Sequence, residues 1–334
     1  MPYWIHAAGF VLETGAIAIL LQLLDEILVR LPFAWYAALS ITLPIALILG
    51  LRRAAGEPWQ PLDLGLAVRV NIDWAETLWL LLLQTSVLLA ALLYLGQRHY
   101  HDLLDFLGFA CRKLTGRTEP YAPFMAALAL TFLLRHGWVG ELLHRGYIQG
   151  LGTIRFGAAV GGFIAWIATG ATAGASMFRL GSGGILVPAL IGLAIIFPGP
   201  LFEAYYVRNR TILPLAAVRA LSAIGAFSGG GLYLYWHPDR AFALAAPLLA
   251  LTSSALLLLS IIAAGRLRGL WWTALGIVES GAARGAAPAL ALGALLAADS
   301  ARGTPGVRTA FCVASITAVL LRAGRGQGSR SHPQ

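Results

Sequence analysis

The chain has 334 residues, of which 58% are hydrophobic and only 12% are charged. About a quarter of the residues of a soluble domain are charged, so this composition excludes an ordinary soluble domain and indicates a membrane protein. The 24 basic and 15 acidic residues give a formal net charge of +9. Nucleic-acid binding is not expected from this charge, because the arginines are spread over the loops instead of being gathered on one face.

Long apolar stretches are the main elements along the chain. Six stretches of 19 to 25 residues contain no Asp, Glu, Lys or Arg: 31–51, 77–97, 156–178, 180–202, 220–238 and 241–265. Each is long enough to cross about 30 Å of hydrocarbon as a helix. Lipid cannot satisfy open backbone groups, and long unbroken apolar runs are not typical of a membrane β-barrel. The sequence therefore predicts an all-α fold, a polytopic transmembrane helical bundle.

Further spans are less clear-cut. Two carry a single charge each, 4–24 with Glu13 and 121–140 with Arg135, and weaker candidates lie at 285–298 and 309–321. The expected total is about eight spans, up to ten. The expected organisation is N-terminal transmembrane helices and interfacial loops over 1–118, a core over 119–238, C-terminal transmembrane helices over 239–322 and a disordered tail over 323–334.

Two connecting segments are long. Residues 52–76 contain two prolines and mixed charge, which is typical of an interfacial loop. Residues 96–122 alternate polar and apolar positions at helical spacing, so we expect part of this segment to lie flat at the membrane surface. It contains His99, His101, Asp102 and Asp105. These could ligate a metal, but a solvated polar face is the favoured interpretation.

The arginines predict the orientation of the bundle. Counting loops alternately, one side carries Arg52, Arg53, Arg69, Arg145, Arg155, Arg208, Arg210, Arg266 and Arg268. The other side carries Arg30, Arg98, Arg112, Lys113, Arg117, Arg179 and Arg240. The small excess favours a cytoplasmic N terminus. The expected location is the cell membrane, in bacteria the inner membrane, with membrane lipids as partners.

The stretch GELLHRGYIQG, residues 140–150, places charges at the end of an apolar span. Glu141 and Arg145 are four residues apart and lie on one face of a helix, with His144 beside them. An acid within a span tends to face the bundle interior and to have a partner. The simplest interpretation is that Arg145 neutralises Glu141.

The same stretch resembles the first motif of the CPBP family, the CAAX-protease and bacteriocin-processing membrane proteins. That motif is Glu-Glu-x-x-x-Arg followed by Gly and often Gln, and the matching residues are Glu141, Arg145, Gly146 and Gln149. Residues 61–74 and 207–226 are similar to further segments of the family. The resemblance implies an eight-helix intramembrane endopeptidase, in which glutamates and a histidine activate water and a second histidine with an asparagine polarises the scissile carbonyl.

Most of the implied catalytic positions are replaced. The first motif glutamate falls on Gly140, the second-motif histidine on Gly170 or Ser182, and the third-motif histidine and asparagine on Arg219 and Ala223. The resemblance therefore implies a non-catalytic scaffold, or a partner of other membrane proteins or peptides. Its site residues Glu141 and Arg145 are remnants of the catalytic motif. An active peptidase with a rewired site and a small-solute transporter are the alternatives.

No cofactor or metal is expected, and Cys111 and Cys312 predict neither a disulfide framework nor a zinc site. Spans near 121–146, 156–178, 180–202 and 211–235 are expected to form a four-helix core with Glu141 and Arg145 facing its interior. A guanidinium within a span needs an ionic partner. The resemblance places position 219 opposite the first motif across the core, so Arg219 is expected to pair with Glu141 or Glu203.

Overall fold

The structure is a computed structural model that describes residues 3–28, 30–54, 59–66, 72–115, 129–130, 132–180, 184–226 and 241–302. Within these ranges every regular element is a helix. The predicted all-α class is thereby confirmed. The candidate span at 309–321 and the tail at 323–334 lie outside the described residues.

The described residues form fourteen helical elements. In chain order they are α1 (Tyr3–Leu28), α2 (Phe33–Ala54), the 3₁₀ turn η1 (Pro61–Leu64), α3 (Trp74–Arg98), α4 (Tyr100–Thr115), the π-helices η2 (Phe132–Val139) and η3 (Leu142–Gln149), α6 (Gly150–Phe156), α7 (Ala158–Leu180), α8 (Leu186–Ile196), α9 (Gly199–Asn209), α10 (Leu213–Ile224), α12 (Ala241–Ile262) and α13 (Ala264–Arg302). Among the described residues, six helices or helix pairs are long and apolar enough to cross a membrane: Tyr3–Leu28, Trp35–Ala54, Trp74–Arg98, Ala158–Phe178, Leu186–Asn209 and Ala245–Ile262. Together they form a polytopic helical bundle, as predicted.

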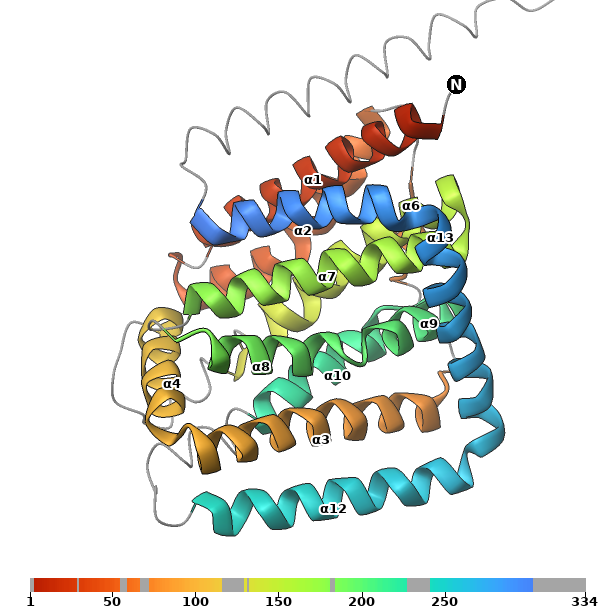
Figure 1. Cartoon of the computed structure of the whole chain (residues 1–334). Coiled ribbons are helices and arrows are strands. Elements are labelled where there is room, and N and C mark those ends of the chain that lie inside the picture. The colour runs from red at the N-terminus through yellow and green to blue at the C-terminus, as the bar shows by residue number, and fades with distance from the viewer. Residues whose placement is uncertain are drawn as a thin grey trace, which may run out of the picture.

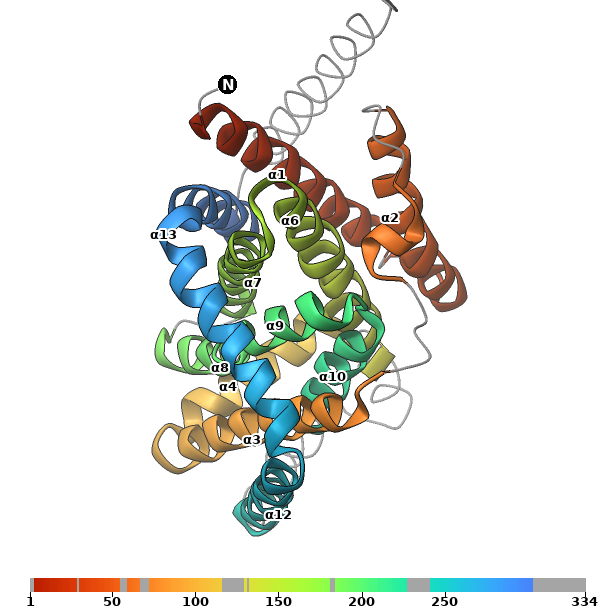
Figure 2. The same ribbon diagram turned by 90° about the vertical axis from the view of Figure 1, so that its right-hand side faces the viewer.

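The long helices run side by side, and a different element crosses each end of the bundle (Figure 1). At one end lies α4, which packs against α3, α7 and α8. At the other end, where α2, α6 and α9 finish and α3 and α13 begin, the first part of α13 runs across the helix ends before α13 bends to lie along α7 (Figures 1 and 2). We call this second end the arginine end, because Arg52, Arg53, Arg155 and Arg208 occupy the last turns of the helices that finish there.

Helix α7 is central, and glycines bring α13 close to it. Gly162 faces the side chain of Ile277, Gly281 faces Phe163, and Gly293 faces Ile167. Small residues let membrane helices approach closely, which is how helices associate where there is no hydrophobic effect between them. The predicted four-helix core did not include α13. In the structure, one buried cluster contains residues as far apart as Phe10, Leu142 and Leu292.

Two connecting segments can be compared with expectation. Helix α4 covers most of the segment 96–122 and buries Leu103, Phe106 and Leu107 on its apolar side. That it lies flat at the membrane surface stays a prediction. The segment 52–76 differs from a purely interfacial loop. Leu64 is fully buried, and the carbonyl oxygen of Gly65 accepts a 3.0 Å hydrogen bond from the backbone N–H of Ile212. This part of the loop therefore packs into the bundle, because its backbone oxygen finds a donor at the start of α10.

Gly281→Ala tests the α7–α13 contact. A Cβ at this position would lie 2.4 Å from the Cβ of Phe163 and 2.7 Å from the backbone oxygen of Ala159. The helices must separate to accept it, so we expect a loss of about 1–3 kcal/mol in thermal unfolding in detergent. Gly276→Ala is the matched control, because its Cβ would meet no atom within 4 Å. It should leave stability unchanged or raise it, and equal melting of the two variants would contradict this packing.

Candidate functional site

The candidate site is built on two π-helices, η2 and η3, which flank Gly140 and Glu141. At the end of η3 the backbone N–H of Gly150 donates to the carbonyl oxygen of Arg145, five residues earlier. Helices with this wider hydrogen-bond spacing are rare in proteins, and those that occur are often found at functional sites. All residues of η3 are buried, including His144, Arg145 and Gln149. The polar residues of the stretch that resembles the first CPBP motif therefore point into the protein and away from lipid.

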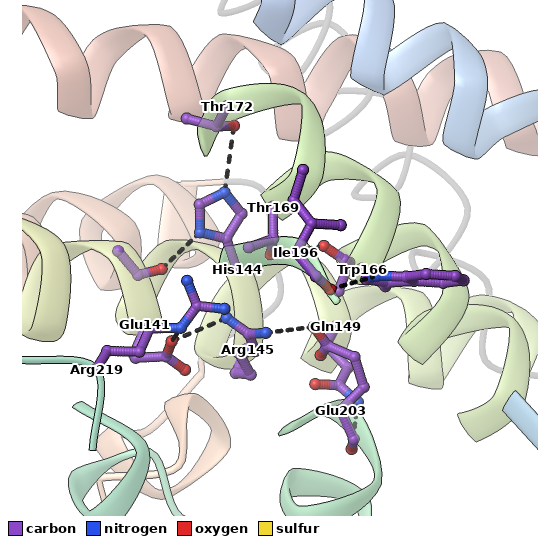
Figure 3. A network of polar contacts seen from close by, with 12 residues as sticks. Glu141, His144, Arg145, Gln149, Trp166, Thr169, Thr172, Ile196, Glu203 and Arg219 are labelled. Carbon is purple, nitrogen blue, oxygen red and sulfur yellow. Dashed lines mark hydrogen bonds and ion pairs between the residues drawn. The ribbon is translucent and has the colours of Figure 1, made fainter. Parts of the chain in front are cut away.

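Arg145 joins two carboxylates from different helices (Figure 3). Its Nη1 donates to Glu141 Oε1 at 2.8 Å, and its Nη2 donates to Glu203 Oε1 at 2.5 Å. The side chains of all three residues are 0% exposed. Glu141 Oε1 also forms an ion pair with Nε of Arg219 from α10. The result is a chain of alternating charges, which we call the core ion network: Arg219, Glu141, Arg145 and Glu203.

A break between α8 and α9 positions Glu203. The span from Leu186 to Asn209 is interrupted at Phe197 and Pro198, and proline has no N–H to continue the helical ladder. The carbonyl oxygen of Ala194, four residues before Pro198, instead accepts a 3.2 Å hydrogen bond from Gln84 Nε2. The carbonyl oxygen of Ile196, four residues before Pro200, accepts one of 3.3 Å from Trp166 Nε1 of α7. Gln149 Nε2 donates to the backbone oxygen of Glu203 at 3.1 Å, which ties η3 to α9.

The network has no formal net charge when all four groups are ionised. Phe202 lies beside both guanidinium groups, with ring-centroid distances of 5.8 Å to Cζ of Arg145 and 5.2 Å to Cζ of Arg219. The negative face of an aromatic ring attracts such cations. A buried network of this kind does not by itself ensure stability, but losing one member leaves an uncompensated buried charge.

His144 adjoins the network on the side of α7 (Figure 3). Its Nδ1 lies 2.7 Å from the carbonyl oxygen of Gly140, which can only accept, so Nδ1 carries a proton. Nε2 lies 3.4 Å from Thr172 Oγ1, and the carbonyl oxygen of Ala168 lies 2.8 Å from the same hydroxyl. The hydroxyl has a single proton, so it donates either to Ala168 or to Nε2, not to both.

The sequence-based expectations about this site can now be checked. Glu141 and Arg145 face the interior as expected, and the expected pairing of Arg219 with Glu141 is confirmed. A Cβ on Gly170 would contact Ile196 at 3.5 Å, so a side chain there would point toward α8. The α7 side chain that reaches His144 is Thr172. Ser182 lies outside the described residues.

A second ion cluster was not predicted from the sequence. The carboxylate of Glu13 in α1 pairs with Arg52, accepts a 2.5 Å hydrogen bond from Arg155 Nη2, and accepts another of 3.2 Å from the Tyr147 hydroxyl. The only available signal was an isolated acid within an apolar span, which implies a buried partner. Which arginine would reach it depends on how the helices pack.

Metal binding finds no support in the part of the chain that the structure describes, where no three His, Cys, Asp or Glu side chains are grouped as ligands. His99 and Asp102 are 3.6 Å apart at the surface, and Asp102 is 62% exposed.

Comparisons of the chain with models of protein families, with curated proteins and with solved structures find no match. What the fold and the site define is a class: a polytopic helical membrane protein with a buried ion network in its centre.

Arg219→Gln should destabilise the protein by about 3–5 kcal/mol in thermal or denaturant unfolding in detergent, because it leaves Glu141 with one of its two guanidinium partners in the interior. Arg266→Gln is the control. Its ion pair with Asp73 is exposed, with 66% of the Arg266 side chain accessible, so the expected loss is about 0–1 kcal/mol.

The double variant Glu141→Gln/Arg219→Gln should lose less unfolding free energy than the sum of the losses in the two single variants. The coupling energy of residues in one ion-pair network is about 0.5–3 kcal/mol. Additive losses would show that the two side chains do not interact, which would contradict the network.

Proposed function

We propose that this chain is a non-catalytic multi-pass membrane protein related to the CPBP endopeptidases, in which the catalytic centre has been replaced by the core ion network. Its role is that of a scaffold or partner for other membrane proteins or peptides, in the cell membrane and, in a bacterium, the inner membrane. The observation that carries the proposal is the ion pair between Arg219 and Glu141. The resemblance places a catalytic histidine at position 219, where this chain has a guanidinium bound to the remaining motif glutamate.

The positions of the polar groups support a structural role. Peptide hydrolysis needs a base within reach of a water molecule and donors aimed at the developing oxyanion. Glu141 Oε1 is engaged by both Arg145 and Arg219, and the carboxylate is fully buried. His144 uses Nδ1 to hold the carbonyl oxygen of Gly140. Each of these groups is therefore committed to a contact within the protein.

An active peptidase with a rewired site is the second candidate, and one observation favours it. Glu141 Oε2 and Glu203 Oε2 are both buried and have no hydrogen-bond partner in the described part of the chain. A carboxylate oxygen of this kind can accept a proton from water. Activity has to be measured to separate the two candidates.

The test is a cleavage assay with purified protein in detergent and in lipid nanodiscs. The substrates are a fluorogenic prenylated peptide and a peptide that carries the membrane-proximal part of a transmembrane segment. We expect the same background signal from the parent and from Glu141→Gln, since Glu141 is already held by Arg145 and Arg219 in the parent. Cleavage by the parent that disappears in Glu141→Gln would reject the non-catalytic function and establish the rewired peptidase.

Restoring a family residue provides a complementary measurement. Arg219→His should give no cleavage, because Gly140 and Ala223 still lack the implied carboxylate and amide. The same variant should unfold more readily than the parent, because Glu141 loses an ionic partner. Cleavage gained in Arg219→His would instead mean that the rest of the catalytic machinery is intact.

A further inference from the structure

The first part of α13, residues 264–276, lies across the arginine end of the bundle (Figure 1). We call this segment the α13 arm. It has two different faces. Leu267, Leu270 and Ala274 are buried against the bundle, with spacings of three and four residues that put them on one side of a helix. The outward side carries Arg268, Trp271, Trp272 and Leu275, and Arg266 lies at the edge of the buried side; all five are exposed.

Three contacts hold the arm in place. Arg266 pairs with Asp73 at 3.4 Å, just before α3 begins. Arg208 Nη1 donates to the backbone oxygen of Arg266 at 3.3 Å. The ring of Trp271 meets that of Trp79 edge to face, with centroids 6.2 Å apart. These contacts determine which face of the arm points outward.

The outward face suits neither bulk water nor the hydrocarbon core. Trp272 is 68% exposed and Trp271 is 48% exposed, while the Arg266 side chain is 66% exposed. Exposed tryptophans are disfavoured in water, and guanidinium groups are costly in hydrocarbon. The headgroup layer of a membrane accepts both, since tryptophan rings are enriched there and arginines meet lipid phosphates.

Charge indicates which lipids are favoured. The arm contains Arg266 and Arg268 and no acidic residue, and the exposed Arg53 ends α2 at the same end of the bundle. Asp73 occupies only part of the Arg266 guanidinium, which has five N–H donors. A basic segment fixed at headgroup depth attracts anionic lipids.

We propose that the α13 arm is a binding site for anionic phospholipid headgroups. Arg266 and Arg268 contact the lipid phosphates, and Trp271 and Trp272 enter between the headgroups and the upper acyl chains. The site is independent of the core ion network and of the non-catalytic function. The arm would then bind anionic lipids in preference to neutral ones at the outer surface of the bundle.

Fluorescence quenching by brominated lipids tests this site. The full chain is reconstituted in phosphatidylcholine vesicles that contain a minor fraction of either dibrominated phosphatidylglycerol or dibrominated phosphatidylcholine. The quenching that is lost in Trp271→Phe/Trp272→Phe reports the lipid at the arm. We expect the anionic lipid to be preferred there by roughly 30-fold, since each arginine near an anionic surface contributes roughly fivefold.

Arg266→Gln/Arg268→Gln should bring this preference close to one. Arg30→Gln/Arg98→Gln is the matched control, because it removes two exposed arginines that flank helices at the α4 end, and it should leave the preference unchanged. If the double variant of the arm does not fold, Arg268→Gln alone, which leaves the Asp73 contact intact, should reduce the preference roughly fivefold. Equal quenching of the parent arm by the two lipids, or an equal loss in the control variant, would overturn the proposal.

Discussion

An ionised group in an apolar interior needs a partner, and this constraint governs the centre of the protein. Arg145 meets it by binding Glu141 and Glu203 at once, and Arg219 completes the chain of charges. The requirement explains the neighbouring irregular elements. A π-helix presents Arg145 and Gln149 to α9, and the break at Phe197 and Pro198 brings Glu203 toward them. Each feature costs regular helical hydrogen bonding, and each delivers a charged side chain to a partner from another helix.

The same constraint applies to the buried charges near the arginine end. Glu13, within the first span, is surrounded by Arg52, Arg155 and the Tyr147 hydroxyl. At the arginine end, Arg208 pairs with Glu76 at 2.6 Å and also holds the backbone of the α13 arm. Charges that tie helices together and the arginines of the proposed lipid site are thus found at the same end of the bundle.

Function follows from what the charged groups are free to do. In the peptidases that the chain resembles, a glutamate takes a proton from water, whereas here Oε1 of Glu141 is held by Arg145 and Arg219. The tertiary contacts of α7 with α13, made through glycines, further close the bundle around η3 and α9. A binding or scaffolding role is compatible with such a centre, and the lipid site proposed at the α13 arm would add a contact with the surrounding membrane.

The sequence by itself determined the fold class, because charge-free runs of 19 residues or more can be stable only as helices in lipid. It also predicted that Glu141 and Arg145 share one helix face and that Arg219 must find a carboxylate, since these conclusions need only local spacing and the cost of a buried charge. Tertiary structure decided the rest. The packing of the helices decides which carboxylate pairs with Arg219 and which arginines pair with Glu13. It also decides that Leu64 is buried in the bundle and that η3 is a π-helix. Residues far apart in the chain make those contacts, so no local pattern contains them.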